Sequence, residues 1–345
     1  MIATALATLA LSLSLSASPP GDAPPEPLAQ AKKVFDRLPK EFASKENPIT
    51  EAKVELGRTL YFDPRLSKNH DVSCNSCHDL ATFGVDNKKF SEGHRKQLGG
   101  RNSPTVYNAG DHVAQFWDGR ADTLEAQAKG PITNPVEMAA PSEAHVVATL
   151  KSIPGYVKLF RKAFPKEKDP VTFDNVARAI GAFERRLVTP SRFDRYLAGD
   201  RKALTAEEKA GLATFLEVGC TTCHNGVAIG GNSFQKLGLV EPYPDESDLG
   251  RFDHTKDDED RMKFRVPTLR NVAKTGPWFH NGSKESLDDV IRTMGKHQLG
   301  VVLTDVQVKQ LEAFLNSLTG ELPKKYLAPP KLPESGPETP KPDPS

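Results

Sequence analysis

Two short stretches of the chain carry the residues best placed to do chemistry. Both follow the pattern Cys-x-x-Cys-His, over Cys74–His78 and Cys220–His224. Two thiols with this spacing can each bond a vinyl group of one porphyrin, and the histidine that follows can ligate the iron. The pattern therefore predicts two covalently bound c-type haems. Their residues are Cys74, Cys77, His78, Cys220, Cys223 and His224.

Two other kinds of site also use Cys-x-x-Cys pairs. A thioredoxin-like redox pair leaves both histidines unexplained, and a zinc site normally combines two such pairs within one module. The chain has four cysteines in all, and the two motifs use every one of them. No cysteine is left for a disulfide or for a nucleophile.

Length and composition fit a protein of two ordinary domains. The chain has 345 residues, of which 37% are hydrophobic and 26% charged, and its formal net charge is +1. This balance provides no basic surface for a nucleic acid and no acidic bias toward a polycation. Composition thus excludes these partners and selects no function by itself.

The beginning of the chain is typical of an exported protein. Residues 1–18 are rich in Ala, Leu and Ser and end in small residues, as secretory signal peptides do, and the run is short for a membrane span. It lacks the usual basic start, so a membrane anchor is the alternative. Because haem attachment to C-x-x-C-H takes place outside the bacterial cytoplasm, we expect a periplasmic protein with no span in its mature chain.

Helical periodicity runs through most of the sequence, and strand-like alternation is not sustained. The predicted helices cover residues 50–61, 146–164 and 173–187 and begin at capping boxes over 205–208, 286–289 and 304–307. The predicted fold is mostly α, with two cytochrome c-like haem domains and long loops. We expect a linker at 19–30, domains at 31–190 and 191–322, and a Pro-rich tail at 323–345.

A second similarity follows each haem motif at one constant offset. Ser103–Asn108 (SPTVYN) matches Val266–Asn271 (VPTLRN), and Phe116–Gly119 (FWDG) matches Phe279–Gly282 (FHNG). A shared offset over about twenty residues without a gap indicates a duplicated module.

The two copies differ where a second iron ligand is needed. Met294 lies on an apolar helical stripe with Leu287 and Ile291, and its equivalent in the first copy is Pro131, which cannot ligate iron. A methionine ligand raises the reduction potential of a haem. Two chemically different haems are therefore predicted, although core packing explains Met294 equally well, and Met262 is a weaker rival.

Three residues near the first motif are candidates for chemistry at its iron. His94 lies in a Gly-flanked loop, from which a histidine could reach an iron and also swing away. Gln127 and Glu137 fall in the segment where the second copy carries its methionine. A carboxylate there could move a proton between the two oxygens of bound peroxide, and an amide could hydrogen-bond one of them. A surface histidine and a solvated polar pair are the alternatives.

Most other histidines have no comparable placement in the sequence. His280 is a candidate packing or electron-path residue. Those expected to be surface or structural residues are His70, His112, His145, His254 and His297.

With these motifs the chain resembles the bacterial di-haem cytochrome c peroxidases, from about residue 51 to the helix around Leu311. The matching segments are Gly57–Pro64, both C-x-x-C-H sites, Gly99–Thr105, Gln115–Arg120, Gly130–Met138 and Met294–Gly300. The resemblance implies reduction of hydrogen peroxide to water with electrons from a small carrier, such as a cytochrome c or a cupredoxin. It also implies a homodimer and a tail that folds back on the N-terminal domain.

The resemblance further implies roles for single residues. His224 and Met294 would ligate a high-potential haem that accepts electrons. His78 would ligate a low-potential peroxidatic haem, with His94 as its displaceable ligand in the oxidised form. Trp117 would lie between the haems.

For the chemistry itself, the resemblance implies that Gln127 and Glu137 form the distal catalytic pair. A calcium ion between the domains would be held by the Asn102 side chain and the carbonyls of Thr275 and Pro277, because calcium prefers oxygen ligands.

Two other functions remain open on the sequence. A related branch of the family matures tryptophan cofactors in a partner protein and has tyrosine in place of the methionine, so Met294 argues against it. A di-haem electron carrier without catalysis is the other alternative. The acidic stretch over residues 245–261 is either a solvated loop or a docking surface for a basic donor.

Overall fold

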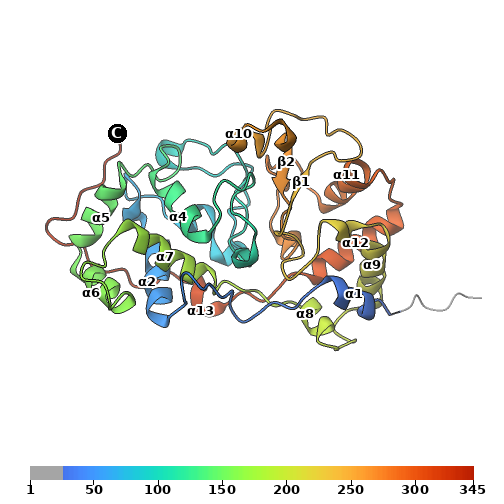
Figure 1. The fold of residues 1–345 in the computed structure, drawn as a ribbon, viewed down its shortest axis with the longest axis horizontal. Coiled ribbons are helices and arrows are strands. Elements are labelled where there is room, and N and C mark those ends of the chain that lie inside the picture. Colours follow the sequence, from blue (N-terminus) through green and yellow to red (C-terminus); the bar gives the residue numbers. More distant parts are fainter. Residues whose placement is uncertain (1–25) are drawn as a thin grey trace, which may run out of the picture.

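The computed structural model describes residues 26–345, so the expected signal peptide and most of the expected linker lie outside the described residues. Two helical halves lie side by side along the long axis of the molecule (Figure 1). The described part is mostly helical, as predicted, and its only sheet pairs two strands of three residues each. The chain crosses from the first half to the second between residues 184 and 192 (Figure 1).

The first half contains the first haem motif and five longer helices. They are α2 (Glu51–Tyr61), α4 (Leu124–Thr133), α5 (Glu143–Lys151), α6 (Pro154–Ala163) and α7 (Phe173–Glu184). The single helix predicted over 146–164 is wrong, because the chain breaks between α5 and α6 at Pro154. Proline has no N–H for the helical ladder but fits the first turn of a new helix.

The second half repeats this plan around the second haem motif. Its helices are α1 (Leu28–Val34), α8 (Arg192–Leu197), α9 (Ala206–Glu217), α10 (Phe252–Thr255), α11 (Leu287–Leu299) and α12 (Asp305–Ser317). The capping boxes predicted at Thr205 and Thr304 are confirmed, and Ser286 caps α11. Strands β1 (Phe234–Lys236) and β2 (Lys263–Arg265) pair antiparallel, with Gln235 opposite Phe264.

One close helix contact at a glycine organises each half. A Cβ on Gly57 of α2 would lie 1.9 Å from the Ala179 carbonyl oxygen of α7. A Cβ on Gly211 of α9 would lie 1.8 Å from the Gln310 carbonyl oxygen of α12. Only glycine permits such backbone approach, so each helix before a haem motif is held tightly against a second helix.

The two ends of the described chain each pack on the opposite half. Helix α1 starts inside the expected linker, and Phe35 just after it packs edge-to-face on Phe193 of α8. Helix α13 (Lys324–Leu327) places Tyr326 against Phe183 of α7. The tail then runs along the first half, where Thr339 contacts the hydroxyl of Ser152.

The halves meet about an approximate two-fold axis. The amide of Asn102 donates to the His280 carbonyl at 2.7 Å, and the amide of Arg265 donates to the Trp117 carbonyl at 2.8 Å. Asn102 and Arg265 are equivalent in the repeat, as are Trp117 and His280. The Thr189 hydroxyl accepts from the side chains of the equivalent residues Asn108 and Asn271, each at 2.8 Å. These reciprocal bonds support a duplicated module.

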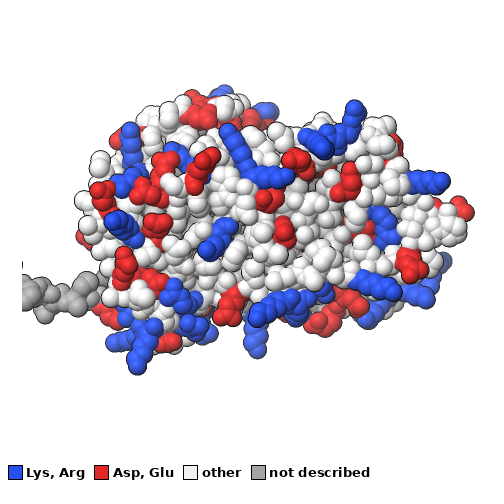
Figure 2. All heavy atoms as spheres, turned by 180° about the vertical axis from the view of Figure 1, so that it is seen from behind, with Lys and Arg blue, Asp and Glu red and all other residues white. Residues whose placement is uncertain are grey.

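The surface carries charges of both signs. Basic and acidic side chains are interspersed over the face drawn in Figure 2. Among residues 26–345, no helix is both long enough and apolar enough to cross a membrane.

Candidate active site

The first haem motif forms one helical turn, α3 (Cys74–Cys77). Ser73 and Ser76 cap this turn reciprocally, and the Tyr61 hydroxyl donates to the His78 carbonyl at 2.6 Å. These contacts tie the motif to α2. Burial lowers the pKa of His78, so its imidazole is neutral, which is the form that ligates iron.

A cavity of about 510 Å³ opens beside His78. Gln127, Pro131 and Glu137 line it together with Cys77. Within residues 26–345, Nδ1 of His78 is a buried nitrogen with no hydrogen-bond partner. A thiol and an unpaired neutral imidazole on the wall of a large cavity fit a haem c. Because Pro131 stands where the second copy has Met294, no thioether faces this cavity from that position.

Glu137 is half-buried on the wall of this cavity. The Asn134 amide donates to Glu137 Oε1 at 2.9 Å. Burial raises the pKa of Glu137, and the nearby positive charge of Arg120 opposes the rise. Together with Gln127 it places an acid and an amide on one cavity wall.

His94 lies in the structure with its ring directed at the tail. Its Nε2 is 3.1 Å from the Ser345 carbonyl oxygen, and its backbone amide donates to the Glu137 carbonyl at 2.7 Å. The residue before it, Gly93, lines the first cavity, whereas His94 does not. The loop therefore lies against the segment that carries Glu137, with the His94 side chain turned away from His78.

The second haem motif begins as a single 3-10 turn over Cys220–Thr222. Burial lowers the pKa of His224 to about 4, which keeps this imidazole neutral. Two cavities of about 120 and 110 Å³ flank it, and Met294 of α11 lines both. Cys220 and Cys223 line the first of these two, so thiols, imidazole and thioether converge as a haem c with two axial ligands requires.

Trp117 stands between the two sets of cavities and lines all three. Its indole N–H donates to the Asn102 carbonyl at 2.8 Å. His280 packs edge-to-face on Trp117 and stacks on Phe264, with ring centroids 4.1 Å apart. The candidate electron-path residue His280 is thus a buried neighbour of Trp117.

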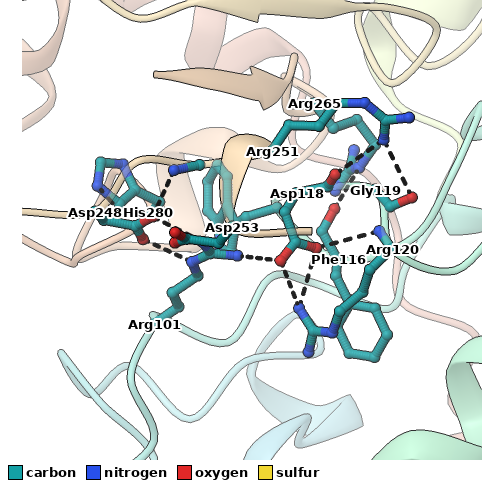
Figure 3. A network of polar contacts seen from close by, with 12 residues as sticks. Arg101, Phe116, Asp118, Gly119, Arg120, Asp248, Arg251, Asp253, Arg265 and His280 are labelled. Carbon is teal, nitrogen blue, oxygen red and sulfur yellow. Dashed lines mark hydrogen bonds and ion pairs between the residues drawn. The ribbon is translucent and has the colours of Figure 1, made fainter. Parts of the chain in front are cut away.

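An ion-pair network joins Arg101 and Asp118 of the first half to Asp248 of the second (Figure 3). Arg101 donates to Asp118 at 2.6 Å and to Asp248 at 2.6 and 2.7 Å. Farther along the acidic stretch, Asp260 pairs with Arg251 and Lys263. The stretch over 245–261 is therefore partly structural, and neither alternative drawn from the sequence describes all of it.

The three residues expected to bind calcium line one cavity. Asn102, Thr275 and Pro277 surround the cavity of about 110 Å³ between the halves. The Asn102 amide nitrogen donates to the Lys88 carbonyl at 2.9 Å, which orients the side chain. An amide oxygen and backbone carbonyls are ligands that suit calcium.

Sequence reasoning missed two residues at the boundary of the cavities. His112, expected to be a surface or structural residue, is buried and lines the first and third cavities. Arg265 is buried and lines all three. The one available signal was the repeat register, in which Arg265 is the equivalent of Asn102.

Known proteins match this chain both as a family and as individual relatives. The family model for di-haem cytochrome c peroxidase matches residues 51–202. The chain is 50% identical to the cytochrome c551 peroxidase of Pseudomonas aeruginosa, over 91% of each chain. It is 46% identical to the cytochrome c551 peroxidase of Nitrosomonas europaea, over 83% of this chain and 85% of that one.

A solved structure shows the same fold. It is a MauG-like protein associated with microbial copper homeostasis, with a TM-score of 0.75 and 30% identity over 86% of this chain and 97% of that chain. Two C-x-x-C-H sites, the duplicated module and identity along nearly the whole chain lead to one conclusion. The chain belongs to the di-haem cytochrome c peroxidase family.

Proposed function

We propose that this enzyme reduces hydrogen peroxide in the first cavity with two electrons that a small carrier protein delivers at the second haem site. One peroxide, two electrons and two protons yield two waters. The observation that carries this proposal is the asymmetry of the cavities. Met294 lines the cavities beside His224, whereas Pro131, Gln127 and Glu137 line the cavity beside His78.

The residues that would hold the two haems are Cys74, Cys77 and His78 for the first, and Cys220, Cys223, His224 and Met294 for the second. When bound, haem supplies the iron that takes up peroxide and passes electrons. Trp117 is proposed to carry or shape the electron path, because it lines the cavities of both sites.

Glu137 and Gln127 are the proposed catalytic pair. Glu137 takes the proton from one peroxide oxygen and returns it to the oxygen that leaves as water. Burial raises its pKa, which makes the carboxylate a stronger base toward a peroxide proton. Gln127 donates its amide N–H to a peroxide oxygen and so orients the substrate.

His94 is the proposed gate of the first cavity. Its imidazole would hold the first iron in the oxidised form and would withdraw toward Ser345 in the half-reduced form. Two features support an exchange between two positions. Gly93 beside it lines the cavity, and the His94 ring has a partner outside it in Ser345.

Calcium is proposed to bind Asn102, Thr275 and Pro277 and to fix the two halves relative to each other. A chelator should then slow turnover and lower the temperature of unfolding, and added calcium should restore both. If isothermal titration detects no calcium binding to the chelated holoenzyme, this site is excluded.

The carrier, the assembly and the location are further parts of the proposal. The names of the Pseudomonas and Nitrosomonas relatives support a small c-type cytochrome as the donor, and a cupredoxin is the second candidate. We propose a homodimer in the periplasm. Light scattering of the purified holoenzyme tests the dimer, and fractionation of the producing cells tests the location.

The deciding experiment mixes peroxide with the holoenzyme in two states, fully oxidised and half-reduced. We expect rapid oxidation of reduced cytochrome c by the half-reduced form and a lag or slow rate for the oxidised form. Equal rates would exclude the His94 gate. Loaded haems that are six-coordinate in every redox state and show no peroxidase activity would instead indicate an electron carrier. Peroxide-driven oxidation of a partner protein without a carrier would indicate a partner-modifying oxidase.

A further inference from the structure

Glu184 is a buried acid at the C-terminal end of α7, a helix that packs against both α2 and α4 (Figure 1). Its side chain is 4% exposed, and Oε2 has no hydrogen-bond partner among residues 26–345. It lines the cavity of about 510 Å³ beside His78 and neither of the two cavities beside His224. The group therefore belongs to the first haem site alone.

The cation next to Glu184 is already paired with another acid. Arg185 donates to the two carboxyl oxygens of Glu125 at 2.6 and 3.0 Å. Although burial acts to raise it, the pKa of Glu125 is lowered by the hydrogen bonds from Arg185 and Asn47. Burial raises the pKa of Glu184 to about 8, because Arg185 offsets only part of the effect and the charge of Glu125 adds to it. Two neighbouring acids thus hold opposite protonation states at neutral pH.

Two further titratable groups lie near Glu184, Tyr61 of α2 and Cys74 of α3. Burial raises the pKa of both, and the negative charge of Glu184 adds to the rise. Neither provides a counter-charge. The Cys74 thiol is expected to bond the porphyrin, and the Tyr61 hydroxyl donates to the His78 carbonyl. Glu184 is therefore the acid of this cluster that is able to gain or lose a proton.

The second copy of the repeat has no acid at the equivalent position. Three pairs of residues make the same contact in α7 and in α12, at one constant offset. The pairs are Ala179 with Gln310, Phe183 with Phe314, and Leu187 with Leu318. At this offset the equivalent of Glu184 is Leu315, which is buried in the apolar core of the second half. A buried acid without a partner costs stability, so its presence beside one haem site alone calls for a function there.

The proposed reaction needs protons that its catalytic pair does not supply. Reduction of one peroxide to two waters consumes two protons and two electrons. Glu137 moves a proton from one peroxide oxygen to the other, so it adds none of these two. An electron that enters a buried site also adds negative charge where little water is present to screen it. An acid that binds a proton at the same time cancels this charge.

We propose that Glu184 binds a proton when the first haem gains an electron, and so stores one of the two protons that peroxide reduction consumes. The electron comes from the carrier protein and the proton from solvent, and the Glu184 carboxylate becomes a neutral carboxylic acid. The proton leaves Glu184 again when the electron passes to the substrate. Glu184 acts here through its charge and is a positioning residue. This inference rests on the haem that the proposed function places beside His78.

The midpoint potential of the His78 haem should then depend on pH. By linkage, an electron that raises the proton affinity of Glu184 is itself bound more tightly when Glu184 is protonated. The reduction equilibrium should weaken by up to about tenfold per pH unit, which is about 59 mV for one electron. Because the pKa of Glu184 is about 8, the fall should lie between about pH 7 and 9. Below this window Glu184 is protonated in both redox states and the potential is highest.

Two variants of Glu184 test this dependence. Glu184→Gln is neutral at every pH, so it should flatten the dependence and leave the potential at about pH 9 above that of the unmodified enzyme. Glu184→Leu copies the second repeat and should do the same. Glu143→Gln in the exposed first turn of α5 is the control and should keep the dependence. The His224 haem is the internal reference, and its potential should be the same in all four proteins.

The experiment is a spectroelectrochemical titration of the holoenzymes between about pH 6 and 9, with haem content measured first. A second measurement uses the unmodified enzyme alone, so it does not depend on haem loading of a variant. Reduction of the first haem at about pH 8 should take up protons from a solution that contains a pH-indicator dye. The infrared difference spectrum of the same step should show a carboxylic-acid band appearing.

An equal pH dependence of the His78 haem potential in Glu184→Gln and in the unmodified enzyme, with full haem loading, would overturn this inference. So would reduction of the first haem in the unmodified enzyme without proton uptake. Peroxidase turnover is measured separately with reduced cytochrome c. Absent turnover in the unmodified enzyme would defeat the proposed function, whereas the titration and the proton uptake decide the role of Glu184 without any turnover.

Discussion

Trp117 and His280 occupy equivalent positions in the two repeats, and their rings meet edge-to-face across the interface with centroids 6.4 Å apart. One copy has an indole at this position and the other an imidazole, although the backbone around them is alike. Phe116 and Phe279, which precede them, both have positive φ angles, of 66° and 68°. The duplication has thus kept its backbone and diverged in the side chains between the haem sites.

The first prediction concerns the acid on the wall of the first cavity. Glu137→Gln should reduce peroxide turnover by at least about 100-fold while both haems stay bound, because an amide cannot shuttle the proton. Stopped-flow oxidation of reduced cytochrome c by peroxide measures this loss. Glu143→Gln in the exposed first turn of α5 is the control and should leave turnover unchanged. Turnover near the normal rate in Glu137→Gln would remove Glu137 from the mechanism.

The second prediction separates the two candidate methionine ligands. Met294→Leu should weaken the reduction equilibrium of the His224 haem by more than about tenfold, because the thioether favours ferrous iron. Its midpoint potential should fall accordingly. Met262→Leu is the matched control. Met262 is buried in the same apolar cluster but lines none of the three cavities. A large shift in Met262→Leu without one in Met294→Leu would reverse the assignment.

The third prediction concerns the tail that meets the His94 loop. Lys68 Nζ donates to the Ser345 carbonyl at 2.6 Å, and the same carbonyl oxygen lies 3.1 Å from His94 Nε2. Deleting residues 333–345, or changing Lys68 to Met, should therefore free His94 for the iron. The low-spin fraction of the first haem in the half-reduced enzyme should rise, as measured by electron paramagnetic resonance. Lys158→Met on the exposed face of α6 is the control. An unchanged low-spin fraction in the deletion variant would show that the contact with Ser345 does not hold His94 away from the iron.

The fourth prediction uses a buried acid that the proposed mechanism leaves aside. Glu184 of α7 lines the first cavity, and burial raises its pKa to about 8, with Glu125 contributing and Arg185 opposing. The native state then binds one proton more than the unfolded chain between about pH 4.5 and 8. The stability that protonated Glu184 contributes is present at low pH. It falls as pH rises through this window, by up to about 1.4 kcal/mol per pH unit.

Glu184→Gln should remove this slope and make the protein more stable than the unmodified enzyme at pH 8. Urea unfolding of the holoenzyme at pH 6, 7 and 8 measures the effect, with Glu259→Gln as the control. Parallel stability profiles for Glu184→Gln and the unmodified enzyme would show that Glu184 does not titrate in this range.

Several features of the fold followed directly from local sequence. The capping boxes at Thr205 and Thr304 predicted the starts of α9 and α12, because a cap depends on residues three positions apart. Pro154 carried the signal for the break between α5 and α6, but the apolar periodicity on either side of it hid that break. The packing of α1 on the second half had no sequence signal, because it depends on contacts with residues far along the chain.

The sequence by itself determined the two C-x-x-C-H motifs, the duplicated module and the difference between Pro131 and Met294, because thiol spacing, helical period and repeat register are local properties. Tertiary structure alone decided that Arg265 meets His112 and that the His94 ring faces Ser345. Those neighbours are separated by more than a hundred residues and meet only when the two halves and the tail pack together. Burial then changes their chemistry, since a cation or an imidazole removed from water needs a partner that the sequence does not reveal.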